Sequence, residues 1–229
     1  MKLEICANSY QSAKNAQDAG AQRIELCQEL SVGGITPSYG FQKQVRDNLE
    51  ISVFVLIRPR GGDFVYSEVE FEIMKHDIQL CKDLGCDGIV SGILNPDKTI
   101  DLKRTKELLE LSKPLPFTFH RAFDEVINPK EALEQLINLG IERVLTSGQQ
   151  TTAESGLALL KELNIMSNGR IIILASSGIT SENALKFKQI GLKEIHASAS
   201  SLLEENNSLF SMPLTYSNPQ KIKAILDAI

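Results

Sequence analysis

A helix-to-strand junction that the sequence repeats four times constrains this fold more than any other feature. Each copy has a glycine after a helical pattern, then two residues, then a strand-like run. Because glycine readily adopts the left-handed conformation that ends a helix, each copy predicts a helix end followed closely by a strand. The same connection used four times is typical of a chain of equivalent units. The glycines are Gly20, Gly85, Gly140 and Gly191.

Short apolar runs alternate with helical patterns along the chain, at a spacing of roughly 25–30 residues that suits βα units. We expect strands at residues 3–6, 23–27, 52–58, 88–91, 115–120, 143–147, 171–175 and 194–198. These eight runs in 229 residues predict an α/β fold, a single (β/α)8 TIM barrel spanning residues 1–229. Residues 200–217 break the rhythm, and we expect an irregular segment there before a C-terminal helix at 219–229.

Capping patterns predict where several of the helices begin. Ser67 with Glu70 and Thr151 with Glu154 both resemble a capping box. Proline fits the first turn of a helix, where its missing N–H group is not needed. Such starts are expected at Thr36-Pro37, at Asn128-Pro129 with Glu131, and at Asn218-Pro219.

The composition excludes some classes of partner. The formal net charge of -5 and the sequence pI near 5.4 argue against a nucleic-acid-binding protein, which needs a basic surface. No apolar run is long enough to cross a bilayer, and the N-terminus lacks a signal-peptide pattern. We therefore expect a cytoplasmic protein with no membrane partner, whose four cysteines are reduced thiols.

Alternation along the strands predicts an unusually polar barrel lumen. Residues two apart in a strand share a face, so outward-facing Leu3 and Ile5 leave Glu4 and Cys6 inside. Branched apolar residues normally fill such a lumen, and buried charges need partners or a ligand. The same alternation places these further side chains inside: Arg23, Glu25, Cys27, Arg58, Thr118, His120, Glu194, His196 and Ser198. For Arg23 and Glu194, deeper in the strands, we expect a structural ion pair.

The C-terminal ends of the strands, where barrel enzymes have their active sites, carry the candidate functional residues. Arginine and glycine in the loops there favour an anionic ligand, because guanidinium groups bind carboxylate or phosphate and glycine lets backbone N–H groups approach. The candidates at or near these ends are Cys6, Cys27, Arg58, His120, Ser147, Ser177 and His196, with Arg60, Asp63, Arg121 and Asp124 in the adjoining loops.

Several of these segments together resemble the CutC family. The matching blocks are LEICANS (3–9), RIELC (23–27), GGITPS (33–38), IRPRGGDF (57–64), TFHRAFD (118–124), RVLTSG (143–148) and HASA (196–199). The resemblance implies a cytoplasmic (β/α)8 barrel, a homo-oligomer such as a dimer, and a role in copper homeostasis. It also implies that Cys6 and Cys27 are the copper(I) ligands. The chain departs from the family after the seventh strand, where Ser176 and Ser177 replace glycines of a glycine-rich turn.

Two functions remain open from the residues themselves. Cys6 and Cys27 end neighbouring inward-facing strands, and soft thiolates select copper(I). A pair of buried cysteines is also common as simple packing, which is the role we expect for Cys81 and Cys86. A pure interaction module is disfavoured, because it needs no charged lumen.

The alternative is an enzyme that acts on a small anionic metabolite, and whether the chain is an enzyme stays open. His120 or His196 would be the general acid or base, with Glu25, Asp63 or Asp124 as the acidic partner. The substrate would be bound by Arg58, Arg60, Arg121, Ser147 and Ser177. A metal-assisted variant would use His120, His196 and Glu25 as ligands. The sequence has no sign of an organic cofactor.

Overall fold

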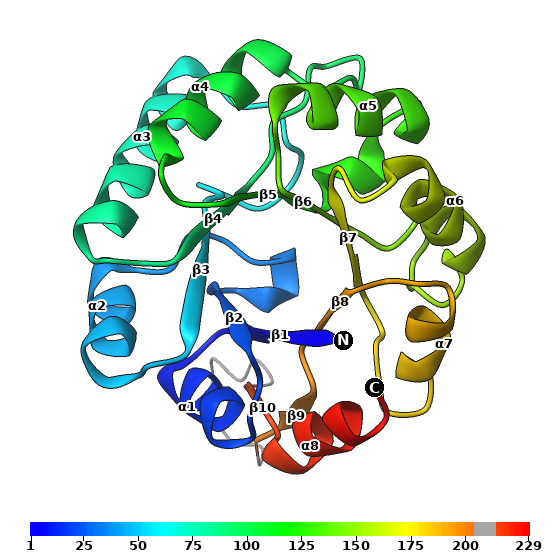
Figure 1. Cartoon of the computed structure of the whole chain (residues 1–229). Coiled ribbons are helices and arrows are strands. Elements are labelled where there is room, and N and C mark those ends of the chain that lie inside the picture. Colours follow the sequence, from blue (N-terminus) through cyan, green and yellow to red (C-terminus); the bar gives the residue numbers. More distant parts are fainter. Residues whose placement is uncertain (204–213) are drawn as a thin grey trace.

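The computed structural model describes residues 1–203 and 214–229, and its centre is a closed barrel of eight parallel strands (Figure 1). The strands are paired in chain order, and β1 also pairs with β8, which closes the barrel. The predicted (β/α)8 TIM barrel is confirmed. The strands are β1 (Lys2–Ala7), β2 (Arg23–Leu26), β3 (Ser52–Leu56), β4 (Gly88–Ser91), β5 (Phe117–Phe119), β6 (Arg143–Thr146), β7 (Ile172–Ser176) and β8 (Glu194–Ala197).

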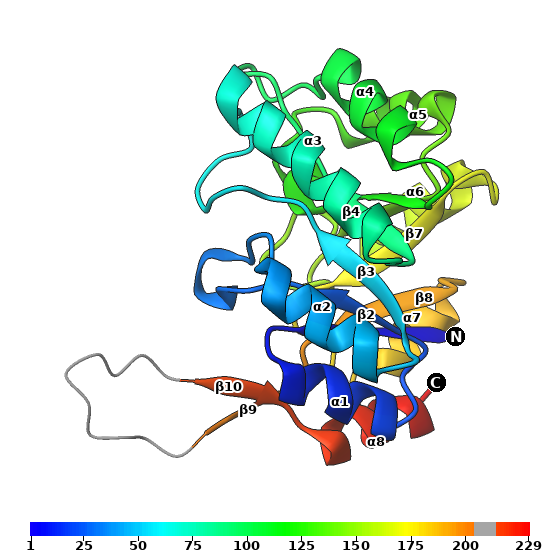
Figure 2. The same ribbon diagram turned by 90° about the vertical axis from the view of Figure 1, so that its left-hand side faces the viewer.

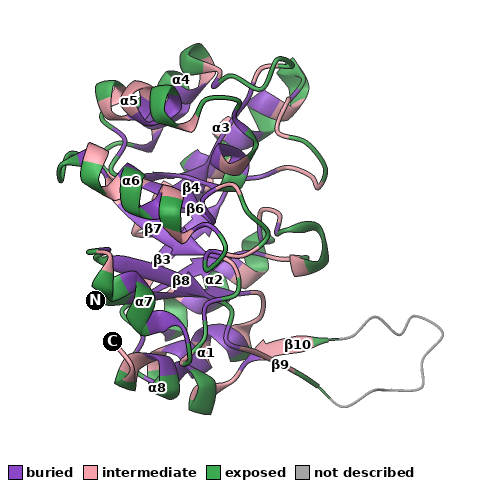
Figure 3. Ribbon diagram, turned by 90° about the vertical axis from the view of Figure 1, so that its right-hand side faces the viewer, coloured by how far each residue is buried: buried purple, intermediate pink, exposed green. Residues whose placement is uncertain are grey.

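Helices surround the barrel and bury one face each against the strands, while their outer faces are exposed (Figure 3). The helices are α1 (Tyr10–Asp18), α2 (Tyr39–Asn48), α3 (Glu68–Asp83), α4 (Leu102–Ser112), α5 (Pro129–Leu139), α6 (Leu157–Ser167), α7 (Ala184–Gln189) and α8 (Pro219–Asp227). Short 3-10 turns lie at Leu30–Val32 and Arg121–Glu125. None of the helices in the described residues is long and apolar enough to cross a membrane.

The four junction glycines adopt the conformation that the sequence predicts. Gly20, Gly85, Gly140 and Gly191 have φ angles of 92°, 69°, 85° and 85°, in the left-handed region. Each therefore ends a helix and lets the chain turn directly into the next strand.

The predicted helix starts are only partly correct. Ser67 and Glu70 form the capping box of α3, and Asn128 and Asn218 cap α5 and α8. The expected start at Thr151 is wrong, because α6 begins at Leu157. Near Thr36-Pro37, α2 begins later, at Tyr39, because Ser38 is its cap.

Glu154, expected in the wrongly placed capping box, instead accepts hydrogen bonds from Asn183 and Lys186. Its carboxylate therefore joins the segment before α6 to the start of α7.

Two short strands occupy the ends of the segment expected to be irregular. Ser200–Leu202 (β9) and Thr215–Ser217 (β10) form an antiparallel pair. The rest of that segment, residues 204–213, lies outside the described residues. Figure 2 shows β9 and β10 projecting from the side of the barrel opposite to the N-terminus.

The alternation of the strands divides the apolar residues into two clusters. Leu3 and Ile5 belong to the large cluster between barrel and helices, as predicted. A small second cluster lies in the lumen and consists of Cys6, Cys27, Phe54, Leu56 and Val90. The lumen thus holds the two candidate thiols in apolar surroundings.

Candidate functional site in the barrel lumen

The register of the strands stacks the inward side chains into layers of four from alternate strands, as in other barrels of this shear. Glu4 pairs with Arg23 and with His196, and Ser176 pairs with His196. Followed around the barrel, the register gives an upper layer of Cys6, Leu56, His120 and Ser176, and below it a layer of Glu25, Val90, Leu145 and His196. Residues from both ends of the chain therefore meet near the mouth.

A buried ion-pair network forms the floor beneath these layers. Arg23 donates from Nε to Glu4 and from Nη2 to Glu194, and Arg143 lies 3.1 Å from Glu194. Both guanidinium groups lie against the ring of Phe54, at 4.7 Å for Arg23 and 5.3 Å for Arg143. These groups satisfy one another, so the structural ion pair expected for Arg23 and Glu194 is present.

His196 lies between the carboxylates of the lumen and the thiol of Cys6. Its Nδ1 atom lies 2.7 Å from Oε1 of Glu4, and Cys6 is close enough to affect the pKa of the ring. Burial alone would lower the pKa of His196, but Cys6, the hydrogen bond to Glu4 and the nearby carboxylates raise it well above its usual range. Burial likewise works against the charged form of Glu4, yet Arg23 and His196 lower the pKa of Glu4 to about 2. The His196–Glu4 pair is therefore ionic.

Glu25 has the opposite environment. Its Oε2 atom is buried without a hydrogen-bond partner among the described residues, and it lies 3.7 Å from Nδ1 of His196. Burial raises the pKa of Glu25 to about 7, against the lowering effect of His196. Glu25 can therefore exchange a proton near neutral pH.

Two cysteine thiols touch at the mouth. The Sγ atoms of Cys6 and Cys27 are 3.4 Å apart, and both residues are buried. The hydrogen bond between Cys6 and Cys27, together with burial, raises the pKa of Cys6 well above its usual range. A second buried thiol pair, Cys81 and Cys86, lies outside the barrel at the end of α3, as expected for packing residues.

His120 belongs to a different part of the lumen from His196. Its ring lies 5.0 Å from that of Phe64, and its Nδ1 atom accepts a hydrogen bond from the backbone N–H of Ala122. Burial and the charge of Arg58 lower the pKa of His120 to about 3. The ring is therefore neutral at physiological pH and carries its proton on Nε2, which has no partner among the described residues.

The arginines predicted to bind an anion have partners within the protein. Nη1 of Arg58 donates to the carbonyls of Val32 and Gly34, and Nη2 donates to that of Gly62. Arg60 pairs with Asp63 and Glu70, and Arg121 pairs with Asp124. In this arrangement the guanidinium groups hold the loops around the mouth in place.

Asp124 holds the loop after β6 through several hydrogen bonds. It accepts hydrogen bonds from the hydroxyl of Thr146 at 2.5 Å, from the N–H and hydroxyl of Ser147, and from the N–H of Gln149. The side chain of Asp63 is 69% exposed in the loop after β3. Among the described residues, neither carboxylate forms a hydrogen bond or ion pair with His120 or His196. Arg58 and His120 do lie near each other, because both pack against the ring of Phe64.

The described residues hold one cluster of metal-binding type: Glu4, Glu25 and His196. The sequence-based ligand set included His196 and Glu25 but named His120 in place of Glu4. The sequence predicts that Glu4 points inward. It does not show that Glu4 lies in register with His196, because that contact forms where β8 pairs with β1 and closes the barrel.

Ser177 anchors the loop after β7. Its φ angle of 82° lies in the left-handed region that favours glycine, and its hydroxyl donates to the carbonyl of Thr151 at 2.7 Å. The serine thus keeps the backbone shape of a glycine turn while adding a hydrogen bond to the neighbouring loop.

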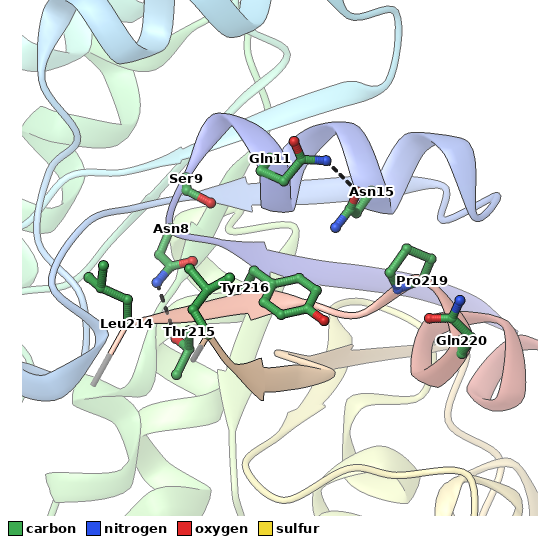
Figure 4. A pocket seen from close by; sticks show the side chains of 10 residues that line it. Asn8, Ser9, Gln11, Asn15, Leu214, Thr215, Tyr216, Pro219 and Gln220 are labelled. Carbon is green, nitrogen blue, oxygen red and sulfur yellow. Dashed lines mark hydrogen bonds between the residues drawn. The ribbon is translucent and has the colours of Figure 1, made fainter. Parts of the chain in front are cut away.

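One surface groove lies away from the predicted site residues. A groove of about 560 Å³ lies between α1 and β10, lined by residues that include Asn8, Ser9, Asn15, Thr215 and Tyr216 (Figure 4). None of the predicted site residues lines it.

Comparison with known proteins gives a consistent family. A model of the CutC family matches residues 1–201. A family protein CutC from Proteus mirabilis is 53% identical over 198 residues, covering 86% of this chain and 79% of the relative. The human copper homeostasis protein cutC homolog is 50% identical over 200 residues, covering 87% and 73%. A crystal structure of CutC from Streptococcus agalactiae has a TM-score of 0.82 at 36% identity, covering 86% and 98%.

Proposed function

This chain belongs to the CutC family, and we propose that it acts in copper homeostasis by binding copper(I) through Cys6 and Cys27. The observation that carries the proposal is the 3.4 Å separation of the two sulfur atoms. Metal–thiolate bonds are about 2.3 Å long, so sulfurs this close can both contact one ion. Copper(I) favours such soft donors, and Phe54, Leu56 and Val90 form a small apolar cluster with the two cysteines.

Copper(I) would have to displace the thiol protons. The pKa of Cys6 is raised, so copper binding competes with protonation and weakens as the pH falls. The cationic His196 ring works in the opposite direction and lowers the pKa of Cys6, which favours the thiolate that copper(I) needs. The lumen therefore supplies two sulfur donors and a neighbouring positive charge.

An anaerobic competition against a chromophoric copper(I) chelator tests this function. We expect the Cys6→Ser, Cys27→Ser double variant to lose at least about tenfold in copper(I) affinity. The matched control is Cys81→Ser, Cys86→Ser, which removes the other buried thiol pair and should bind as the parent does. A lumen double variant that competes as well as the parent contradicts the proposal.

The second candidate is an enzyme that binds a small anionic metabolite at the mouth. It is supported by the buried Nε2–H of His120 and the Oγ of Ser176, which share a layer and lack partners among the described residues. Neutral His120 would donate a hydrogen bond to a substrate oxygen. A thermal-shift screen of phosphate- and carboxylate-bearing metabolites, with and without copper(I), tests this candidate. A stabilising ligand whose effect persists in His120→Ala would rule out that role for His120.

The family resemblance also supports a cytoplasmic homodimer. Light scattering of the purified protein tests the assembly, and cell fractionation tests the location.

A further inference from the structure

The two arginines of the lumen form ion pairs with only two of its three carboxylates. Three carboxylates, Glu4, Glu25 and Glu194, share the space with two guanidinium groups, those of Arg23 and Arg143. Glu4 forms an ion pair with Arg23, and Glu194 forms ion pairs with both arginines. Glu25 forms no ion pair with an arginine among the described residues, and its Oε2 atom is buried and unpartnered. The charged group that faces this oxygen is His196, whose Nδ1 atom lies 3.7 Å away, beyond hydrogen-bond distance, so Oε2 still has room for a metal ion.

The geometry around Glu25 suits a metal ion. Glu4, Glu25 and His196 each offer one ligand atom, and these atoms lie within 4.8 Å of one another. Bonds of about 2.0–2.2 Å to one ion place neighbouring oxygen and nitrogen ligands roughly 3.0–3.5 Å apart. The separations of Nδ1 of His196 from Glu4 and Glu25, 2.7 Å and 3.7 Å, lie on either side of that range. Small side-chain shifts would complete the site.

We propose that Glu4, Glu25 and His196 bind a divalent cation of the zinc class in the barrel lumen, and that the cation displaces the Nδ1 proton of His196 to solvent when it binds. Imidazole together with carboxylate suits a borderline cation of this kind, whereas copper(I) favours the thiols above it. The proposal thus concerns a site other than Cys6 and Cys27, and it does not depend on copper binding.

The residues around the cluster orient it as outer ligands do in metal sites. Arg23 holds the second oxygen of Glu4, and Cys6 lies close enough to the His196 ring to affect its pKa. The His196 side chain is 11% exposed, so the cluster is open to solvent at one edge.

Cobalt(II) serves as a spectroscopic probe of this site in the reduced, metal-free full-length protein. We expect visible d–d bands on titration, no near-ultraviolet thiolate-to-cobalt charge transfer, and loss of the bands when Zn²⁺ is added. Glu25→Gln, which is nearly isosteric, should weaken cobalt(II) binding at least about tenfold. Glu194→Gln is the matched control, because it removes a lumen carboxylate outside the cluster and should leave the affinity within about threefold.

Three results would overturn the proposal. One is a folded wild-type protein that binds neither Co²⁺ nor Zn²⁺. Another is a charge-transfer band that disappears in Cys6→Ser, Cys27→Ser, which would make the thiols the ligands. The third is an unchanged affinity in Glu25→Gln. The copper experiment is separate: a protein that binds copper(I) but not cobalt(II) contradicts the carboxylate–histidine site alone, whereas cobalt binding that survives loss of both thiols supports it.

Discussion

Nδ1 of His196 lies 2.7 Å from Oε1 of Glu4, although the two residues are 192 positions apart in the chain. The contact exists because β8 pairs with β1 and places the two residues in register. It therefore forms only when the barrel closes. The same closure brings His196 to Cys6, so the thiol pair and the carboxylate–histidine cluster both depend on it.

The metal-free protein should show a pH-dependent gain in stability when Glu25 is replaced by Gln. Burial raises the pKa of Glu25 from 4.5 to about 7, so ionisation above pH 4.5 favours the unfolded state, and the penalty is complete above pH 7. Glu25→Gln removes that penalty. Urea unfolding should show no gain at pH 4 and a gain on the order of 3 kcal/mol at pH 8. An equal effect at both pH values would contradict this description of Glu25.

Gly88→Ala should destabilise the barrel from within. A Cβ atom at Gly88 would lie 2.5 Å from the Phe54 ring, which is buried and lies against Arg23 and Arg143. Overpacking of this kind costs about 1–3 kcal/mol. The matched control is Gly40→Ala near the start of α2, where a Cβ would meet nothing within 4 Å. Thermal unfolding should show a loss for Gly88→Ala only, and comparable stability of the two variants would refute the packing argument.

Two substitutions of Ser177 separate its backbone strain from its hydrogen bond. Ser177→Ala keeps the unfavourable φ angle of 82° and loses the bond to Thr151, whereas Ser177→Gly loses the bond but relieves the strain. Left-handed backbone costs a non-glycine residue roughly 1–2 kcal/mol. Denaturant unfolding should therefore rank the glycine variant about 1 kcal/mol above the alanine variant, and the reverse order would show that Ser177 is unstrained.

The barrel and the inward direction of the lumen side chains could be predicted from the sequence, because both follow from local periodicity. Cys6, Cys27, Glu25 and His196 face the lumen as expected. Which of them touch depends on strand register and closure, and local patterns do not fix these. His120 and His196 both lie near the mouth, yet β5 and β8 carry them to different neighbours.

The role of Arg58 could not be predicted for a different reason. Its side chain binds the carbonyls of loops that contain Gly33, Gly34 and Gly62, all with positive φ angles. Glycine-rich loops have many accessible conformations, so the sequence indicates an adaptable loop without showing where its carbonyls point. An arginine beside glycines predicts an anion-binding loop, whereas in the structure Arg58 donates its hydrogen bonds to loop carbonyls.

X-ray absorption spectroscopy of the protein loaded with one equivalent of copper(I) tests the thiol site most directly. We expect sulfur neighbours at bonding distance from copper in the parent and in Cys81→Ser, Cys86→Ser, and their loss in Cys6→Ser, Cys27→Ser. A first shell of nitrogen and oxygen alone in the parent, or the same sulfur signal after both lumen thiols are removed, would contradict copper binding by Cys6 and Cys27.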